Sequence, residues 1–485
     1  MKKLLPLAII SLLFTYACSH DEELNIKKTV DSSSSIVLSK EEVLSIALDN
    51  PTDLSDELLK SIVQNGFIQF TNECKTKGEQ NINIKKMGKY EISRRLVNCV
   101  TKSNPISPVT EKIPIYDIEF ERNGTHGKAI VSGDKRAPRI LAFIPKYIDS
   151  LEKDDVAREA LLKQCELSVL NEIEVVQKIK DSLREPTRLK ISRQLGISEN
   201  SLDYDEIKNE ISIKSEDGII STKGVVETPD NPLSGVFPLL LTQWSTSSHP
   251  YGRNLGAYYS TTGAQYKYPD ENVIAIAQLV AYYQRVKKID NITMDWNYLL
   301  SKPQIFEAVP GERPVGGGEI IPDDPLPLRE MVGALVKQIY TPITKEVVTQ
   351  NSAGNTIVKI VPYVFASTLT SYVEATMPSS VSMEWNIQQV TRGLDTFSPI
   401  LAFTEISDNI LQNTARGTFI IDGYLNCEPE YDGQPNLKYY HVNKGHGGSG
   451  DGYFLMDNNS QAISFNDEDD EYLLNSYSLQ MIVVR

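Results

Sequence analysis

One stretch constrains the fold of this chain more than any other, the apolar run from Asp270 to Tyr283. Its spacing predicts a buried helix, because apolar residues recur at the intervals of a core-facing stripe. These residues are Val273, Ile276, Ala277, Val280, Ala281 and Tyr283. Asp270 and Glu271 stand in the first turn, where the helix dipole favours negative charge. We therefore expect a domain built around this helix, with an acidic helix N-terminus.

The first residues predict export from the cytoplasm. Lys2 and Lys3 precede an apolar run over 4–17 that is too short to span a bilayer. The run ends in Thr-Tyr-Ala-Cys, which resembles a bacterial lipobox with Cys18 as the lipidated residue. The acidic residues that follow resemble the surface-export signal of some Gram-negative lipoproteins. We expect residues 1–18 to be a lipoprotein signal peptide, and the protein to be an outer-membrane, surface-exposed lipoprotein. An ordinary cleaved signal with an incidental cysteine is the alternative.

The charge and the cysteines exclude several classes of function. The net charge of −15 argues against nucleic acid as a partner. The five cysteines are far apart and form no CxxC pair, and the five histidines are equally scattered, so there is no zinc signature. We therefore expect no metal and no cofactor. Cys74 and Cys99 form either a disulfide or two buried thiols, and the sequence leaves this open.

The N-terminal half predicts a small α+β domain over 37–150, after a polar tether over 19–36. Ser39 followed by Glu42 is a capping box at the start of an amphipathic helix. The alternating runs at 113–120 and 127–132 predict two strands joined by a turn, and the apolar run at 140–144 predicts a buried strand.

A helical region and linker over 151–231 separates this domain from a second domain over 232–485. Apolar residues recur at helical spacing from Asp154 to about Leu195. Pro186 lies inside this pattern and predicts a break in the helix, because proline removes a backbone donor and its ring clashes with the preceding turn.

Both halves resemble the precursor of streptopain-like cysteine peptidases, a papain-like family. In the first half the resemblance rests on SKEEVLSIA, YDIEF and KAIVSGDKRAPRILAF. In the second it rests on the order and spacing of PLLLTQW, the 270–283 run, MDWNYLL, GTFIIDGY and HVNKGHGG. The resemblance implies an inhibitory α+β prodomain, built from an antiparallel sheet with helices, that masks the cleft of a papain-like domain. The fold class that we expect is therefore α+β.

Carried over residue by residue, the resemblance implies a site without its reactive groups. Such a site needs a thiolate, an imidazole, an amide that orients the imidazole, and donors for the oxyanion. The nucleophile position falls on Glu271, the imidazole position on Gly417 and the oxyanion donor position on Thr246. The orienting asparagine is retained as Asn443, but Lys444 and His446 replace the two tryptophans that follow it in the family.

Other residues are weak substitutes for the missing groups. Cys427 follows a strand rather than opening a helix, and a packed thiol is its simplest interpretation. His446 stands in a glycine-rich loop near the predicted site, and a packed or surface histidine is the simplest interpretation. Glu271 with Asp270 is a poor carboxylate pair, because neighbours at a helix start point in different directions.

We therefore predict a lipid-anchored pseudopeptidase that acts by binding a peptide or protein, with the membrane as its other partner. Three alternatives stay open: an active cysteine endopeptidase with an atypical site, an adhesin or scaffold, and a protease inhibitor acting through the prodomain. The ligand, the oligomeric state and the fate of the prodomain stay open as well.

Overall fold

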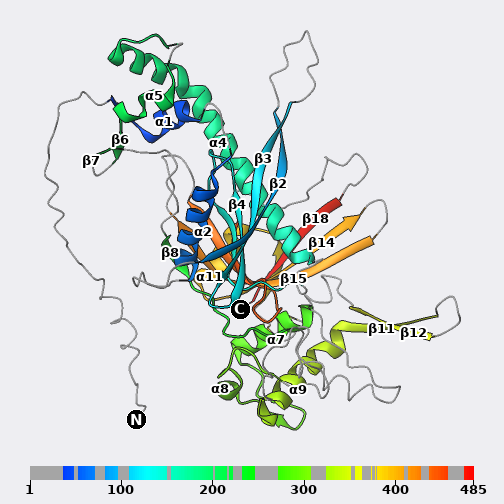
Figure 1. The fold of residues 1–485 in the computed structure, drawn as a ribbon. Helices are drawn as coiled ribbons and strands as arrows, with labels where there is room; N and C mark the ends of the chain where they lie inside the picture. Colours follow the sequence, from blue (N-terminus) through cyan, green and yellow to red (C-terminus); the bar gives the residue numbers. More distant parts are fainter. Residues whose placement is uncertain are drawn as a thin grey trace, which may run out of the picture.

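A computed structural model describes the fold over the following residues: 36–48, 53–71, 82–96, 109–149, 155–199, 202–215, 218–221, 232–245, 271–306, 324–350, 356–362, 373, 377, 380–408, 413–427, 436–456 and 475–484 (Figure 1). Several predictions fall outside these residues. They concern the signal peptide with Cys18, the tether, the Cys74 and Cys99 pair, Thr246 and Asp270.

A large antiparallel sheet forms the centre of the molecule, with strand order β13-β18-β14-β15-β16-β17-β5-β4-β3-β2 and with β8 paired to β15. The strands from the first half of the chain are β2 (Asn83–Leu96), β3 (Val109–Arg122), β4 (Thr125–Ser132) and β5 (Ile140–Ile144). Those from the second half are β8 (Pro232–Val236), β13 (Val381–Glu384), β14 (Ile400–Asp408), β15 (Asn413–Cys427), β16 (Leu437–Asn443), β17 (Gly452–Leu455) and β18 (Asn475–Val483). With helices on the sheet, the fold class is α+β, as predicted.

The two halves of the chain share this sheet. β17 pairs with β5 through Tyr453 opposite Phe143 and Phe454 opposite Ala142. One hydrophobic cluster runs from Leu54 in the first half to Val483 near the end of the chain. The predicted segments 37–150 and 232–485 are therefore joined by backbone pairing and by a common core.

Local sequence signals account for the strands of the first half. The predicted strands at 113–120, 127–132 and 140–144 correspond to β3, β4 and β5. The turn between β3 and β4 has positive φ at both central residues, 50° at Asn123 and 78° at Gly124. This is the backbone of the Asn-Gly hairpin turn, whose twist matches that of paired strands.

Helices cover both faces of the second-half strands. Because side chains alternate along a strand, Ile400 and Ile421 face the cluster that includes residues of α4 (Val156–Leu195) and α11 (Ile387–Asp395). Leu401 and Ile420 face a second cluster with α7 (Glu271–Tyr283), α8 (Trp296–Leu299) and α9 (Leu326–Ile343). The predicted helix over 270–283 is confirmed as α7, which is buried from Asn272 to Ala281.

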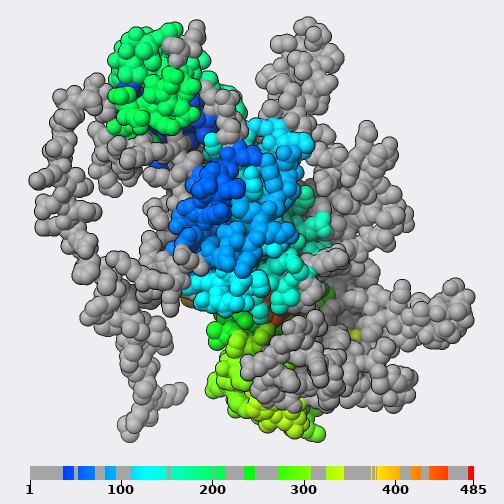
Figure 2. All heavy atoms as spheres, in the orientation of Figure 1, coloured from blue at the N-terminus to red at the C-terminus, as the bar shows by residue number. Residues whose placement is uncertain are grey.

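A small module lies at the far end of α4 from the sheet (Figure 1). It contains β1 (Ile36–Leu38), α1 (Lys40–Ala47), α5 (Tyr204–Ile207), a 3-10 turn (Lys208–Glu210), β6 (Ile211–Ser215) and β7 (Gly218–Ser221). β1 runs parallel to β6, and the predicted capping box of Ser39 and Glu42 is present at α1. In Figure 2 the module is the green and blue bulge above the blue and cyan surface of the described residues between 53 and 149.

The predicted break at Pro186 is wrong. α4 is one helix of 40 residues with Pro186 inside it. Asp155 caps its N-terminus, and Gly196, with φ of 69°, ends it in the left-handed conformation. The local signal does not decide here, because tertiary contacts intervene: α1 packs along α4 on both sides of the proline.

The remaining elements are two short hairpins. They are β9 (Lys288–Ile289) with β10 (Ile292–Thr293), and β11 (Thr344–Gln350) with β12 (Thr356–Pro362). Over the residues that the structure describes, no helix combines the length and the apolar character that a bilayer crossing requires.

Candidate functional site

The N-terminus of α7, the middle of β15 and the end of β16 meet at one place. Thr418 of β15 donates a hydrogen bond from Oγ1 to Oδ1 of Asn272 in the first turn of α7. Glu271 and Gly417 are the chain neighbours of this pair. Gln278, two turns along α7, donates from Nε2 to Oδ1 of Asn443 at 3.0 Å. Glu271 and Gly417 therefore flank one contact, Asn443 is bonded about two turns further along α7, and Thr246 is outside the described residues.

Asn443 is occupied by structural contacts. Its Nδ2 donates to the carbonyl of Thr242 at 3.0 Å, and its Oδ1 also accepts from the backbone N–H of Gly445 at 3.0 Å. Gln278 in turn accepts the backbone N–H of Trp244 at 3.1 Å. Both amide side chains are buried. Asn443 thus ties the segment 242–244 and the end of β16 to α7, and no imidazole from the described part of the chain is among its hydrogen-bond partners.

The first turn of α4 fills the space in front of Gly417. A Cβ atom on Gly417 would lie 2.6 Å from the backbone nitrogen of Ala157 and 3.1 Å from its Cα. Contacts below 3.0 Å to backbone atoms require the backbone to move. A histidine side chain therefore has no room at position 417 while α4 is docked.

A buried ion pair holds that turn in place. Nζ of Lys444 pairs with Oδ2 of Asp155, and the two side chains are only 1% and 7% exposed. Oδ1 of the same carboxylate caps α4 by accepting the N–H groups of Ala157 at 2.9 Å and Arg158 at 3.3 Å. Lys444, which stands where the resemblance expects a tryptophan, therefore fastens α4 to the loop after β16.

Glu271 faces a histidine and not a thiol. Its Oε1 lies 3.8 Å from Nε2 of His446, which is buried, while the Glu271 side chain is 39% exposed. The backbone of His446 also forms an isolated bridge with Ser245. His446 therefore does approach the predicted site, as a packed side chain.

The two described cysteines lie elsewhere, and neither is in a disulfide. Sγ of Cys427 accepts a hydrogen bond from Nε2 of Gln69 at 3.5 Å, and the Cys165 thiol donates to the carbonyl of Leu141 at 3.1 Å. Burial raises the pKa of the Cys165 thiol, which keeps it protonated and unreactive. Cys427 is buried, so its interpretation as a packed thiol agrees with the structure.

A buried acidic cluster was missed in the sequence. Nδ1 of His441 lies 2.6 Å from Oδ1 of Asp422, whose other oxygen accepts the N–H of Leu240 at 3.1 Å. Burial disfavours the charged imidazole, but the charge and hydrogen bond of Asp422 outweigh it and raise the pKa of His441. Burial also raises the pKa of Asp451 to about 6, although Asp451 accepts the backbone N–H of Lys444 at 2.8 Å.

Only strand register reveals this cluster. His441 lies opposite Gly423, beside a register shift between Ile421 and Gly423, and this places it against Asp422. No motif in the sequence signals that pairing. Cys427 lies four residues beyond Gly423 on β15, roughly 13 Å along the strand, so His441 and this thiol do not form a dyad.

The described residues contain no group of three or more His, Cys, Asp or Glu side chains placed to hold a metal ion.

Comparison with known proteins gives one distant likeness. No family model matches the chain, and no curated protein matches it. Among solved structures the chain is similar at a low level to a cysteine protease. The solved structure is that of active wild-type interpain A from Prevotella intermedia, with 16% sequence identity and a TM-score of 0.31. The match covers 53% of this chain and 98% of that one.

Proposed function

We propose that this protein is a pseudopeptidase of the streptopain-like type, which binds a peptide or protein and does not cut it. One observation carries the proposal: backbone atoms of Ala157 occupy the space that a side chain at position 417 would need. A cysteine peptidase needs an imidazole beside its thiol. Glu271 stands at the position expected for the thiol and glycine at the position expected for its imidazole, and no described thiol lies at this place.

The neighbouring groups do not replace that chemistry. In a comparable acyl-transfer enzyme, loss of the nucleophile or its base lowers turnover by roughly 10⁶. The pairing of His446 with Glu271 provides an imidazole and a carboxylate, but no described thiol lies with them. Cys427 bonds to Gln69 of α2 (Asp56–Thr71) and belongs to one hydrophobic cluster, whereas α7 belongs to the cluster on the other face of the sheet.

The ligand surface lies outside the position that α4 covers. Among the large apolar side chains of the described residues, Leu241, Phe397 and Phe237 are the most exposed, at 69%, 65% and 62%. Phe397 also has a φ of 55°, and its carbonyl accepts the hydroxyl of Tyr282 at 2.9 Å. A second candidate function is an adhesin or scaffold that uses its outer surface, where these side chains are exposed. In both cases we propose that Cys18 carries a lipid that anchors the protein at the surface of an outer membrane.

The test of the proposal is treatment of the full-length protein with a thiol-directed epoxide, followed by a casein cleavage assay. We expect no covalent labelling and no cleavage, with papain as the positive control. Labelling of Cys427 together with casein cleavage would contradict the proposal and favour the active endopeptidase. If the folded protein is labelled to the same extent as the denatured protein and cleaves no casein, the labelling reports only that a thiol is accessible.

A further inference from the structure

The longest helix contains a proline that ought to interrupt it. Pro186 has no N–H to offer the carbonyl of Ser182, and its ring crowds that carbonyl. In a helix interior this costs about 3 kcal/mol relative to alanine. Nevertheless α4 continues without a break from Val156 to Leu195. Contacts from outside the helix must therefore offset the cost.

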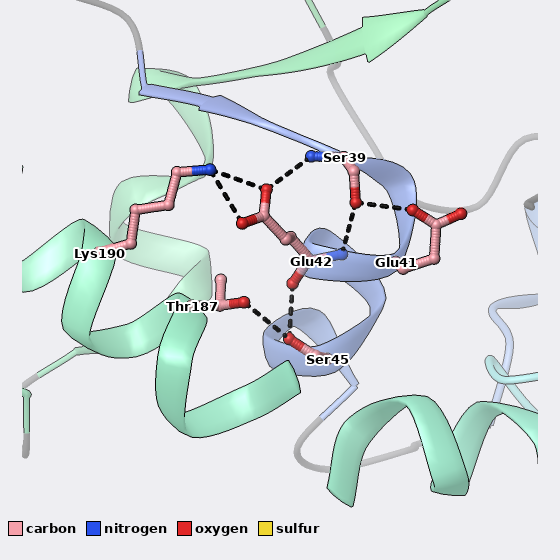
Figure 3. Close-up of polar contacts among 6 residues, drawn as sticks. All are labelled: Ser39, Glu41, Glu42, Ser45, Thr187 and Lys190. Atoms are coloured by element: carbon pink, nitrogen blue, oxygen red, sulfur yellow. Dashed lines mark hydrogen bonds and ion pairs between the residues drawn. The ribbon is translucent and has the colours of Figure 1, made fainter. Parts of the chain in front are cut away.

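Those contacts come from α1, which packs along α4 on both sides of the proline. Before it, Leu48 at the end of α1 forms a buried pair with Val176, and Nζ of Lys180 donates to the Leu48 carbonyl at 3.3 Å. After it, both carboxylate oxygens of Glu42 lie 2.9 Å from Nζ of Lys190 (Figure 3). The α1 segment therefore contacts α4 ten residues before Pro186 and four residues after it.

The contact after the proline includes apolar and polar groups. Ser45 Oγ lies 3.5 Å from Thr187 Oγ1, and both side chains are buried. Val43 and Ile46 of α1 belong to the same buried cluster as Ile191 of α4. Thr187 directly follows the proline, so α1 contacts α4 at the first residue beyond the lost hydrogen bond.

α1 is itself held by its own cap and by the strand before it. Glu42 accepts the backbone N–H of Ser39 at 2.8 Å, and Ser39 Oγ accepts the N–H of Glu42 at 3.1 Å, which completes the capping box (Figure 3). The strand β1 that precedes it pairs with β6 from Ile36 to Leu38. Glu42 therefore serves both the cap of α1 and the bridge to α4.

We propose that α1, by packing against α4 on both sides of Pro186, keeps α4 one continuous straight helix. We call this role of α1 the splint and the straight helix the rod. The rod is about 60 Å long, since each residue adds about 1.5 Å. One end is fixed at the site by the pair of Asp155 and Lys444, and the other lies in the module that contains β1. Without the splint, α4 bends at Pro186 and the module moves relative to the sheet. This inference goes beyond the proposed function and does not depend on it.

Hydrogen exchange of the full-length protein tests the splint. The substitution Leu48→Ala removes the contact before the proline. We expect amides of residues 180–195 to exchange roughly 30-fold faster, because core truncations of this kind weaken the local structure substantially. Amides of 157–173 in the same helix serve as the internal control and stay protected. Glu42→Gln is a milder variant that keeps the capping box, because glutamine also caps.

The decisive comparison uses Pro186→Ala as a second background. Alanine restores the missing donor, so the helix no longer needs the splint, and Leu48→Ala then has little effect on residues 180–195. An equally large effect in both backgrounds would overturn the inference, because α1 would then be ordinary packing. The inference would also be overturned if Leu48→Ala did not accelerate exchange at residues 180–195 in the protein that retains Pro186.

Discussion

Position 417 illustrates how a single missing side chain shapes the site. The absence of a Cβ lets the first turn of α4 approach β15, and the closest backbone atom would stand 2.6 Å from an added Cβ. We expect Gly417→Ala to lower the free energy of unfolding by about 1–3 kcal/mol, as overpacked sites do. Urea unfolding measures this. Gly88→Ala is the matched control, because a Cβ added there would lie 3.7 Å from the nearest non-neighbouring atom, so we expect little change in stability.

The double variant Glu271→Cys with Gly417→His tests the same position for activity. We expect it to remain without casein cleavage, because α4 occupies the space of the imidazole and Lys444 fastens α4 there. Cleavage at a rate near that of papain would show that α4 leaves the site readily.

The ion pair of Lys444 and Asp155 predicts a large and non-additive loss of stability. Removing one partner leaves the other buried and uncompensated, which costs about 3–5 kcal/mol. We therefore expect Lys444→Met to be strongly destabilised in urea unfolding. The double variant Lys444→Met with Asp155→Asn loses less than the sum of the single variants, and Asn at 155 still caps α4. Strict additivity would argue against direct coupling.

Asp451 predicts a pH dependence. Its pKa is raised from 3.8 to about 6 by burial, so the folded protein retains a proton that the unfolded chain releases between these values. Its contribution to stability therefore falls as the pH rises from about 4 to about 6, by about 3 kcal/mol in total. Asp451→Asn cannot ionise, so this variant gains stability relative to the wild type over that window. Parallel stability curves for the two proteins would contradict the assignment.

At the scale of elements, the predictions that rest on local sequence signals are confirmed, and the one that depends on tertiary contacts is wrong. The capping box of α1, the strands β3 to β5 and the helix α7 follow from patterns within each segment, and the structure contains all of them. The break at Pro186 does not occur. Leu48 and Ser45, which contact α4 around the proline, are 132 and 142 positions from their partners in the sequence, so a local pattern does not predict these contacts.

The turn between β3 and β4 offers a test of local control. Gly124 has a φ of 78° with no atom within 4 Å of an added Cβ, so only backbone preference is at stake. We expect Gly124→Ala to cost about 1 kcal/mol, since alanine is strained in the left-handed region. Thermal unfolding measures the loss. A loss above about 3 kcal/mol would indicate contacts beyond this backbone preference.

The candidate site was predictable only in part. The resemblance led to Glu271, Gly417 and Asn443. The bond of Thr418 to Asn272 places the first two beside one contact, and the bond of Gln278 to Asn443 lies about two turns further along α7. The filling of the site by α4 was not predictable, because Ala157 and Gly417 belong to distant parts of the sequence and meet only in the folded chain. The family roles of these positions remain predictions.

At the scale of the whole molecule, the shared sheet predicts cooperative folding. Residues 232–485 alone would expose the edge of β17 and the part of the core that α2 and α4 cover. We expect this fragment to lack fixed tertiary packing, measured by near-UV circular dichroism, while the full chain unfolds in one transition. A fragment with a native-like spectrum would instead support independent domains over 37–150 and 232–485.

The pairing of β5 with β17 also bears on what a proteolytic nick would do. Phe143 and Ala142 lie on one side of any cut made after Asp149, and Tyr453 and Phe454 lie on the other, yet the two strands are adjacent in the ladder. Such a cut would leave two fragments that stay associated through the shared sheet, so they would elute together in size-exclusion chromatography until a denaturant separates them.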